Sequence, residues 1–173
     1  MDLSVVLVSY RSPGLLLAGL RALRADAAGA GLALDIVVVD NDSRDGTLEA
    51  LAREAPDVRV VANRENAGYA RAVNQGLAAT GGEFTLVLNP DCEVHAGALR
   101  ALLGHMAAGP RAGLVGPRIV NPDGSLEYSA RSFPDPFTFL FNRYSLLTRL
   151  FPANPFSRRY LLPDWDHASA RRV

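Results

Sequence analysis

Two strand-length segments of this chain are almost continuously apolar, and each leads into an aspartate. Residues 35–39 read Asp-Ile-Val-Val-Val and are followed by Asp40, whereas residues 84–88 read Phe-Thr-Leu-Val-Leu and lead through Asn89 and Pro90 to Asp91. Strands without polar alternation are buried on both faces, which is typical of parallel sheets. Parallel strands end at one edge of a sheet, and open α/β sheets bind ligands in the crevice outside that edge. The sequence therefore predicts that both acids lie at one ligand-binding edge.

Strand and helix patterns alternate over the first two thirds of the chain. The apolar runs predict strands at 3–8, 35–39, 58–62 and 84–88. Between and after them, apolar residues at helical spacing predict helices that begin at 13, 47, 68 and 96. Such alternation predicts an α/β fold with a mostly parallel central sheet and helices on both faces. Residues 114–120 and 126–129 flank the turn signal Asn-Pro-Asp-Gly and predict a hairpin.

Bulk composition excludes several classes of protein. The 173 residues are enough for one domain, and the 18 basic and 18 acidic residues balance, so we expect no nucleic-acid partner. The single cysteine, Cys92, excludes an intrachain disulfide framework and fits a reducing cytoplasm. The first residues carry no basic segment of a signal peptide, and no apolar run is long enough to span a membrane.

The last forty residues have a different pattern, so we divide the chain into residues 1–132 and an aromatic, basic tail at 133–173. In that tail we predict one helix with an apolar stripe, and arginines lie alongside it. The stripe consists of Phe137, Leu140, Phe141, Tyr144 and Leu147, and the arginines are Arg143, Arg149, Arg158 and Arg159. We favour packing of this stripe in a core, and peripheral membrane contact is the alternative. An uncovered strand edge predicts self-association into a homo-oligomer.

Four short motifs, in this order and at these separations, resemble the inverting glycosyltransferases of family 2, and within them the rhamnosyltransferase-like branch. The motifs are VLVSY at 6–10, VVDNDSRDGT at 38–47, NAGYARAVN at 66–74 and LNPD at 88–91. Each motif alone is a weak signal, whereas the four together are a strong one. The resemblance extends from Leu3 to the end of the chain, and it implies a nucleotide-diphospho-sugar transferase fold of the GT-A type.

The resemblance implies that the first two motifs bind the base and ribose of a nucleotide-sugar donor through Ser9, Tyr10 and Asp40. Asp40 would accept the ring N3 proton of uracil or thymine, or the hydrogens of guanine. This role suits a carboxylate because it only accepts hydrogen bonds, and bonds to charged groups contribute about 1.5–3 kcal/mol. For Asp42 and Asp45 we favour local roles as turn former and helix N-cap.

The third motif is expected to bring backbone and polar side chains to the donor, through Asn66, Gly68, Arg71 and Asn74. Gly68 allows the backbone to approach a ligand closely. Arg71 and Asn74 stand on the first turns of a helix whose positive end favours phosphate. The alternative is an ordinary loop and helix cap.

The fourth motif resembles the family's metal-binding Asp-X-Asp, with Asn89 in the first place and Asp91 in the last. The resemblance implies that Asp91 binds Mg²⁺ or Mn²⁺, which would neutralise charge on the departing diphosphate. Glu93 is near enough in sequence to reach the same region, and a turn-capping role for Asp91 is the alternative. Three histidines show no metal-ligand spacing and are expected to be surface or cap residues: His95, His105 and His167.

An inverting transfer also needs a general base that deprotonates the acceptor hydroxyl. In the family this base belongs to an acidic motif well downstream of the metal site. The chain ends at Val173, so we expect either a truncated form or the donor-binding part of a longer enzyme, with no general base. Asp164-Trp165-Asp166 resembles an Asp-X-Asp, but it lies in the wrong part of the pattern.

The resemblance predicts a glycosyltransferase of cell-wall or polysaccharide biosynthesis. Its donor would be dTDP-rhamnose, or next a UDP-sugar, and its acceptor a glycan or a lipid-linked glycan at the inner face of the membrane. The expected absence of a base favours an alternative class, a nucleotide-sugar-binding or assembly module that transfers no sugar. A sugar-nucleotide pyrophosphorylase lacks support because no glycine-rich phosphate loop follows the first strand.

Overall fold

The computed structural model describes residues 3–127, 129–133, 135–141, 145–162, 165–166 and 169. The chain divides into two compact units, Met1–Val115 and Gly116–Val173. The division that we predicted at residue 132 falls within the second unit and stays a prediction.

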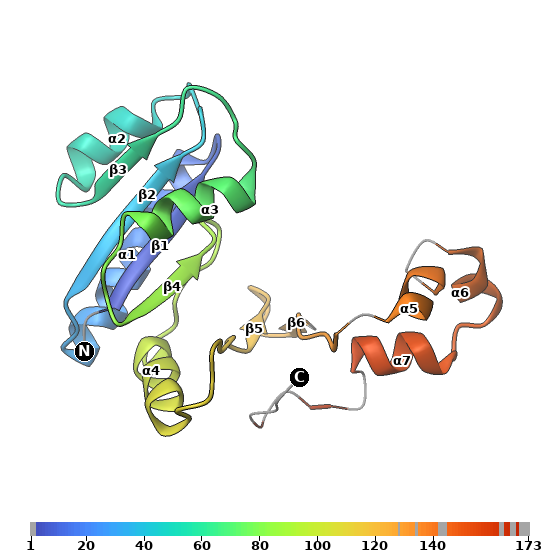
Figure 1. Cartoon of the computed structure of the whole chain (residues 1–173). Coiled ribbons are helices and arrows are strands. Elements are labelled where there is room, and N and C mark those ends of the chain that lie inside the picture. The colour runs from blue at the N-terminus through green and yellow to red at the C-terminus, as the bar shows by residue number, and fades with distance from the viewer. Residues whose placement is uncertain are drawn as a thin grey trace. The chain divides into compact units, whose positions relative to one another are not determined.

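The first unit contains a four-stranded parallel sheet in its described residues, with the strand order β3-β2-β1-β4 (Figure 1). The strands are β1 (Leu3–Ser9), β2 (Leu34–Asp40), β3 (Arg59–Ala62) and β4 (Phe84–Leu88). In this register Ser9 lies beside Asp40, and Leu7 lies beside both Val38 and Leu88. The predicted strands are confirmed to within one residue at each end. Asp40 is the last residue of β2 and Asp91 follows β4, so both predicted acids lie where parallel strands end at the same edge.

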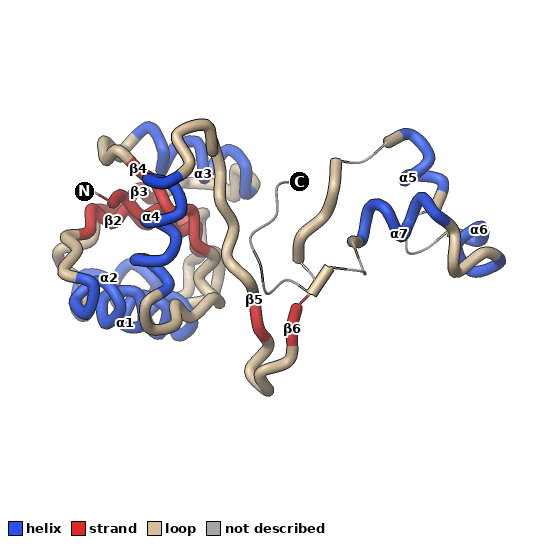
Figure 2. Tube along the Cα trace, turned by 90° about the horizontal axis from the view of Figure 1, so that it is seen from below, coloured by secondary structure: helices blue, strands red, loops and turns tan. Residues whose placement is uncertain are grey.

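Helices cover both faces of the sheet, as predicted (Figure 2). On one face, α1 (Pro13–Ala30), α2 (Thr47–Glu54) and α4 (Ala98–Ala108) bury a large core against β1 and β2. On the other face, α3 (Tyr69–Ala78) packs through Ala72 on a smaller cluster of valines. Because β1 and β2 are covered on both sides, their apolar residues follow one another without alternation.

The start of α2 corrects one prediction. We expected Asp45 to be the N-cap of this helix, which is wrong, because the N-cap is Gly46 at φ +84°. Glycine adopts this left-handed conformation at little cost. Asp45, one residue earlier, instead accepts hydrogen bonds from the backbone N and the Oγ1 of Thr47. Asp45 therefore still stabilises the first turn, although from outside the N-cap position.

Helix α3 approaches β1 closely at Gly76. A Cβ atom at this position would overlap Cγ1 of Val6, which is fully buried in the central part of the sheet. We expect Gly76→Ala to lower the free energy of unfolding by about 1–2 kcal/mol, because overpacking outweighs the gain in helix propensity. Urea unfolding followed by circular dichroism measures this change.

Gly104→Ala in α4 is the matched control for Gly76→Ala. A Cβ atom there meets nothing within 4 Å, so the variant should gain up to about 1 kcal/mol from helix propensity alone. Combining Gly76→Ala with Val6→Ala should relieve the overlap. If Gly76→Ala proved as stable as Gly104→Ala, the close packing of α3 on β1 would be contradicted.

In the second unit, β5 (Ile119–Val120) and β6 (Leu126–Glu127) form the predicted antiparallel hairpin. The first strand is shorter than the predicted run from Leu114, which is 91% exposed. Gly116 and Pro117 interrupt that run, because proline lacks a backbone donor and glycine weakens a strand.

The tail contains three short helices in its described residues, α5 (Pro136–Leu140), α6 (Leu146–Leu150) and α7 (Pro155–Leu161). The single helix predicted across residues 137–147 is therefore wrong. Asp135, Ser145 and Asn154 each cap a new helix with a side-chain oxygen, so the helical pattern is divided. Tyr144 of the predicted stripe and Arg143, one of the arginines predicted beside it, lie outside the described residues.

Two aromatic rings of the predicted stripe pack within the tail. Phe156 of α7 stacks on Phe137, with ring centroids 4.9 Å apart, and on Phe141, with centroids 5.4 Å apart. Among the described helices of the chain, none combines the length and the apolar character needed to cross a membrane.

Candidate functional site

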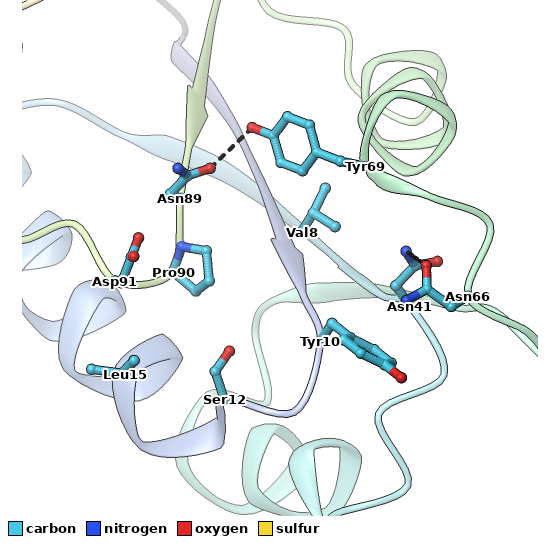
Figure 3. Close-up of a pocket in the computed structure, with 10 residues that line it drawn as sticks. All are labelled: Val8, Tyr10, Ser12, Leu15, Asn41, Asn66, Tyr69, Asn89, Pro90 and Asp91. Carbon is cyan, nitrogen blue, oxygen red and sulfur yellow. Dashed lines mark hydrogen bonds between the residues drawn. The ribbon is translucent and has the colours of Figure 1, made fainter. Parts of the chain in front are cut away.

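An open depression of about 330 Å³ lies at the edge of the sheet where the strands end (Figure 3). Its walls come from the ends of β1, β2 and β4, from the first turn of α1 and from the residues around the start of α3. The lining residues are Val8, Tyr10, Ser12, Leu15, Asn41, Asn66, Tyr69, Asn89, Pro90 and Asp91. Residues from all four of the sequence motifs therefore meet at one place.

Ser9 and Asp40 are buried side by side at the ends of β1 and β2. One carboxylate oxygen of Asp40, Oδ2, accepts a hydrogen bond from the backbone N of Ser43 at 3.2 Å. Within the described residues, the other oxygen, Oδ1, has no hydrogen-bond partner, and neither does the hydroxyl of Ser9. Buried polar atoms are nearly always paired, so two unpaired ones on adjacent strands are an unusual feature of this edge of the sheet. The depression itself is lined by their neighbours, Tyr10 and Asn41.

Asn89 and Asp91 form the wall of the depression that follows β4. The hydroxyl of Tyr69 donates a hydrogen bond of 3.0 Å to Oδ1 of Asn89, which links the start of α3 to the end of β4 (Figure 3). Asp91 is exposed, and it is the only carboxylate among the lining residues.

A metal ion at this site would have few protein ligands. No group of three or more His, Cys, Asp or Glu side chains suited to a metal occurs in the described part of the chain. Mg²⁺ is commonly bound by one or two carboxylates together with substrate phosphates, and it keeps several waters. The oxygen donors of this wall, Asp91 with Asn89 beside it, therefore fit a hard cation that a phosphate ligand brings with it.

The third motif is divided between two places. Asn66 lines the depression, and Gly68 is the N-cap of α3 at φ +82°, a conformation that favours glycine. Arg71 lies instead in a second, smaller depression of about 240 Å³, and Asn74 is exposed and lines neither. Of the predicted site residues, the depression is thus lined by Tyr10, Asn66, Asn89 and Asp91. Ser9, Asp40 and Gly68 stand next to lining residues in the sequence, whereas Arg71 and Asn74 lie elsewhere.

Sequence reasoning missed Asn41 and Tyr69, although both stand inside the motifs. Asn41 is 3% exposed and makes hydrogen bonds to residues more than twenty positions away, so neighbouring residues gave no signal of its role. Leu15 was also missed, because it stands beside the buried stripe of α1 and is itself exposed.

The remaining polar candidates have local roles or lie elsewhere. Asp42 adopts a left-handed turn conformation at φ +67°, as the predicted turn former should. Its hydrogen bond and its charge raise the pKa of Arg44 above the usual value. His95 and His105 are exposed, whereas His167 and Asp164 lie outside the described residues.

Comparison with known proteins supports the same assignment. The family described as Glycosyl transferase family 2 matches residues 4–163. N-acetylglucosaminyl-diphospho-decaprenol L-rhamnosyltransferase of Mycobacterium tuberculosis is 34% identical in an alignment 169 residues long, and the match covers 91% of this chain and 53% of that protein. Succinoglycan biosynthesis protein ExoO of Rhizobium meliloti is 32% identical in an alignment 126 residues long, and the match covers 71% of this chain and 35% of that protein. The chain spans about half the length of the mycobacterial relative and about a third of the length of ExoO.

Solved structures show the same fold. Mannosyltransferase PcManGT from Pyrobaculum calidifontis, in complex with GDP-Man and Mn²⁺, superposes with a TM-score of 0.56 and 26% identity, over 70% of this chain and 36% of that one. TarS of Staphylococcus aureus, residues 1–349 in complex with UDP, has a TM-score of 0.53 and 18% identity, over 69% of this chain and 42% of that one. These neighbours are GT-A glycosyltransferases, so the predicted fold class is confirmed. The chain belongs to glycosyl transferase family 2.

Proposed function

We propose that the depression binds the nucleotide of a nucleoside-diphosphate sugar, and that the chain is the donor-binding part of a metal-assisted, inverting glycosyltransferase. Oxygens of Asp40 and Ser9 that have no partner among the described residues support this proposal, because they are buried directly next to the lining residues Asn41 and Tyr10. A carboxylate oxygen without a donor suits a ligand that presents an N–H group, as the edges of uracil, thymine and guanine do.

The wall of the depression that follows β4 suits the diphosphate. Asp91 would hold Mg²⁺ or Mn²⁺ together with the phosphate oxygens, and Asn89 is kept beside it by its bond to Tyr69. A bound cation would neutralise the charge that develops on the departing diphosphate. Tyr10, 43% exposed at the end of β1, offers its ring to the base or the ribose.

For the sugar we propose rhamnose, carried as dTDP-rhamnose, because the relative at 34% identity is named as a rhamnosyltransferase. A UDP-sugar is the second candidate. We propose a lipid-linked glycan as the acceptor, since that relative's name specifies a diphospho-decaprenol acceptor. Transfer would then take place at the inner face of the membrane.

Among the described residues that line the depression, Asp91 is the only acid, and we assign it to the cation. No second acid of this described lining is left for the general base. This observation favours the second candidate function for the chain taken alone, a donor-binding module without transfer activity.

Calorimetric titration with dTDP, UDP and GDP, each with and without Mn²⁺, tests the proposal. We expect one nucleotide to bind, and to bind more tightly with Mn²⁺. In Asp91→Asn the affinity with Mn²⁺ should fall to the metal-free value, because the carboxylate that holds the cation is gone.

Asp57→Asn is the control for Asp91→Asn. It makes the same chemical change on an exposed aspartate whose partner is Arg24 on α1, so nucleotide affinity should not change. If none of the three nucleotides bound under any condition, the proposed function would be wrong for this chain. Metal-dependent binding that survived Asp91→Asn would reject only the metal assignment.

A further inference from the structure

A buried amide, Asn41, connects the end of β2 to the segment of residues 63–68 that precedes α3. Its Nδ2 donates to Oδ1 of Asn66 at 2.8 Å. Its Oδ1 accepts two hydrogen bonds of 3.0 Å, one from Nδ2 of Asn63 and one from the backbone N of Ala67. One donated and two accepted hydrogen bonds of this small side chain are thus directed at a single loop.

Two backbone amides fix the direction of these bonds. A backbone N–H can only donate, so Ala67 requires an acceptor from Asn41. The backbone N of Gly68 likewise donates to Oδ1 of Asn66 at 3.0 Å, which fixes the oxygen of Asn66 at that point. Asn41 must then present a donor to Asn66 and an acceptor to Ala67 at the same time. A primary amide meets this requirement, whereas a carboxylate, which only accepts, does not.

The ordered segment leads directly into the wall of the depression. Asn63 is also paired with Gln75 of α3 by two hydrogen bonds of 2.9 Å each. Asn41 and Asn66 both line the depression, and their side chains meet in Figure 3. Tyr69, which follows Gly68, reaches the other wall through Asn89.

We propose that Asn41 is a positioning residue: it orders residues 63–68 through Asn66 and Ala67, and so shapes the depression for its nucleotide before the nucleotide arrives. A wall that is already ordered lowers the entropic cost of binding. The effect on nucleotide affinity rests on the proposed function, whereas the ordering of the segment does not.

A matched pair of variants, Asn41→Asp and Asn66→Asp, tests the ordering. Each adds one negative charge to the same wall. In Asn66→Asp the carboxylate still accepts from both Asn41 and Gly68, so the Gly68 amide should stay protected. In Asn41→Asp the donor is lost, and Asn66 must either move away or turn its nitrogen towards the new carboxylate. Both responses release the Gly68 amide, so its hydrogen exchange, measured by NMR, should become about tenfold faster.

Nucleotide affinity is the second readout. Asn41→Asp should bind the preferred nucleotide about tenfold more weakly than Asn66→Asp, which carries the same added charge. Hydrogen exchange at the amides of β1 should be equally fast in Asn41→Asp and Asn66→Asp. This comparison separates a local loss of order in residues 63–68 from a general loss of stability. Asn66→Ala, at an exposed position, removes the acceptor itself and should also release the Gly68 amide even if Asn41→Asp does not fold.

Three results would overturn the proposal. If hydrogen exchange at the Gly68 amide were unchanged in Asn41→Asp and Asn66→Ala, the hydrogen bonds of Asn41 and Asn66 would not order the segment. Equal exchange in the two aspartate variants would show that the donor of Asn41 is not needed. Equal nucleotide affinities, despite different exchange, would show that the ordering does not shape the depression. If the unsubstituted chain bound no nucleotide, the proposed function would fail, while the exchange at Gly68 would still decide the ordering role.

Discussion

Replacing Asp26 by alanine is expected to lower the free energy of unfolding by about 3 kcal/mol, because two charge-assisted hydrogen bonds are lost inside the protein. Asp26 is a buried residue of α1, and its carboxylate accepts from the backbone N of Gly97 and, at 2.8 Å, from that of Leu99. These amides belong to the start of α4, whose own N-cap is Gly97 and offers no side-chain acceptor. Asp26 therefore caps a helix whose N-cap residue stands 71 positions later in the chain.

Urea unfolding of three variants separates this capping role from a general effect of removing an acid. Asp26→Asn keeps one acceptor oxygen and should fall between Asp26→Ala and the unsubstituted chain. Asp57→Ala removes an exposed partner of Arg24 on the same helix and should cost less than about 1 kcal/mol. If Asp26→Ala cost no more than Asp57→Ala, the capping of α4 from α1 would be wrong.

The capping bond also matters for the site, because α1 touches the segment that carries Asp91 at two points. A Cβ atom on Gly19 of α1 would lie 3.2 Å from the carbonyl oxygen of Pro90 and 3.3 Å from that of Cys92. Asp26, two turns further along α1, holds Gly97 at the other end of the same segment. The position of Asp91 is therefore set by α1 as well as by the end of β4.

The first unit could be predicted closely because its strands are apolar without interruption, which leaves little choice but a buried, mostly parallel sheet. The resemblance of the motifs predicted Tyr10, Asn66, Asn89 and Asp91 as site residues, and all four line one depression in the structure. The role of Asn41 could not be predicted, since its partners Asn63 and Asn66 stand 22 and 25 positions away and only the fold brings them near.

Two other features were hidden for different reasons. Asp26 stands in an alanine- and glycine-rich stretch, and nothing beside it shows that α4 will need a cap. In the tail, the apolar spacing suggested one helix, while the capping residues Ser145 and Asn154 begin new helices within about ten residues of each other. Local capping outweighed the periodic pattern there, because short helices are decided by their ends.

Replacing Asp40 by asparagine is expected to weaken nucleotide binding by about 10- to 100-fold, the equivalent of one hydrogen bond to a charged group. The same change should leave the free energy of unfolding unchanged or raise it. Oδ1 of Asp40 is buried and has no hydrogen-bond partner in the described part of the chain, so the fold bears the cost of an unsatisfied charge. Asparagine removes that charge and still offers an oxygen to the backbone N of Ser43.

Asp35→Asn is the control on the same strand, at the opposite end of β2 from Asp40. Its carboxylate pairs with Arg59 at 2.6 Å, so this variant should lose up to about 1 kcal/mol of stability and bind nucleotide normally. The two variants should therefore show opposite patterns in calorimetry and in urea unfolding. If Asp40 served only the fold, Asp40→Asn would lower both the free energy of unfolding and the nucleotide affinity. That result would show that Asp40 does not belong to the donor site. If Asp40→Asn instead binds nucleotide more weakly while its free energy of unfolding is equal or higher, Asp40 contributes to binding and not to the fold.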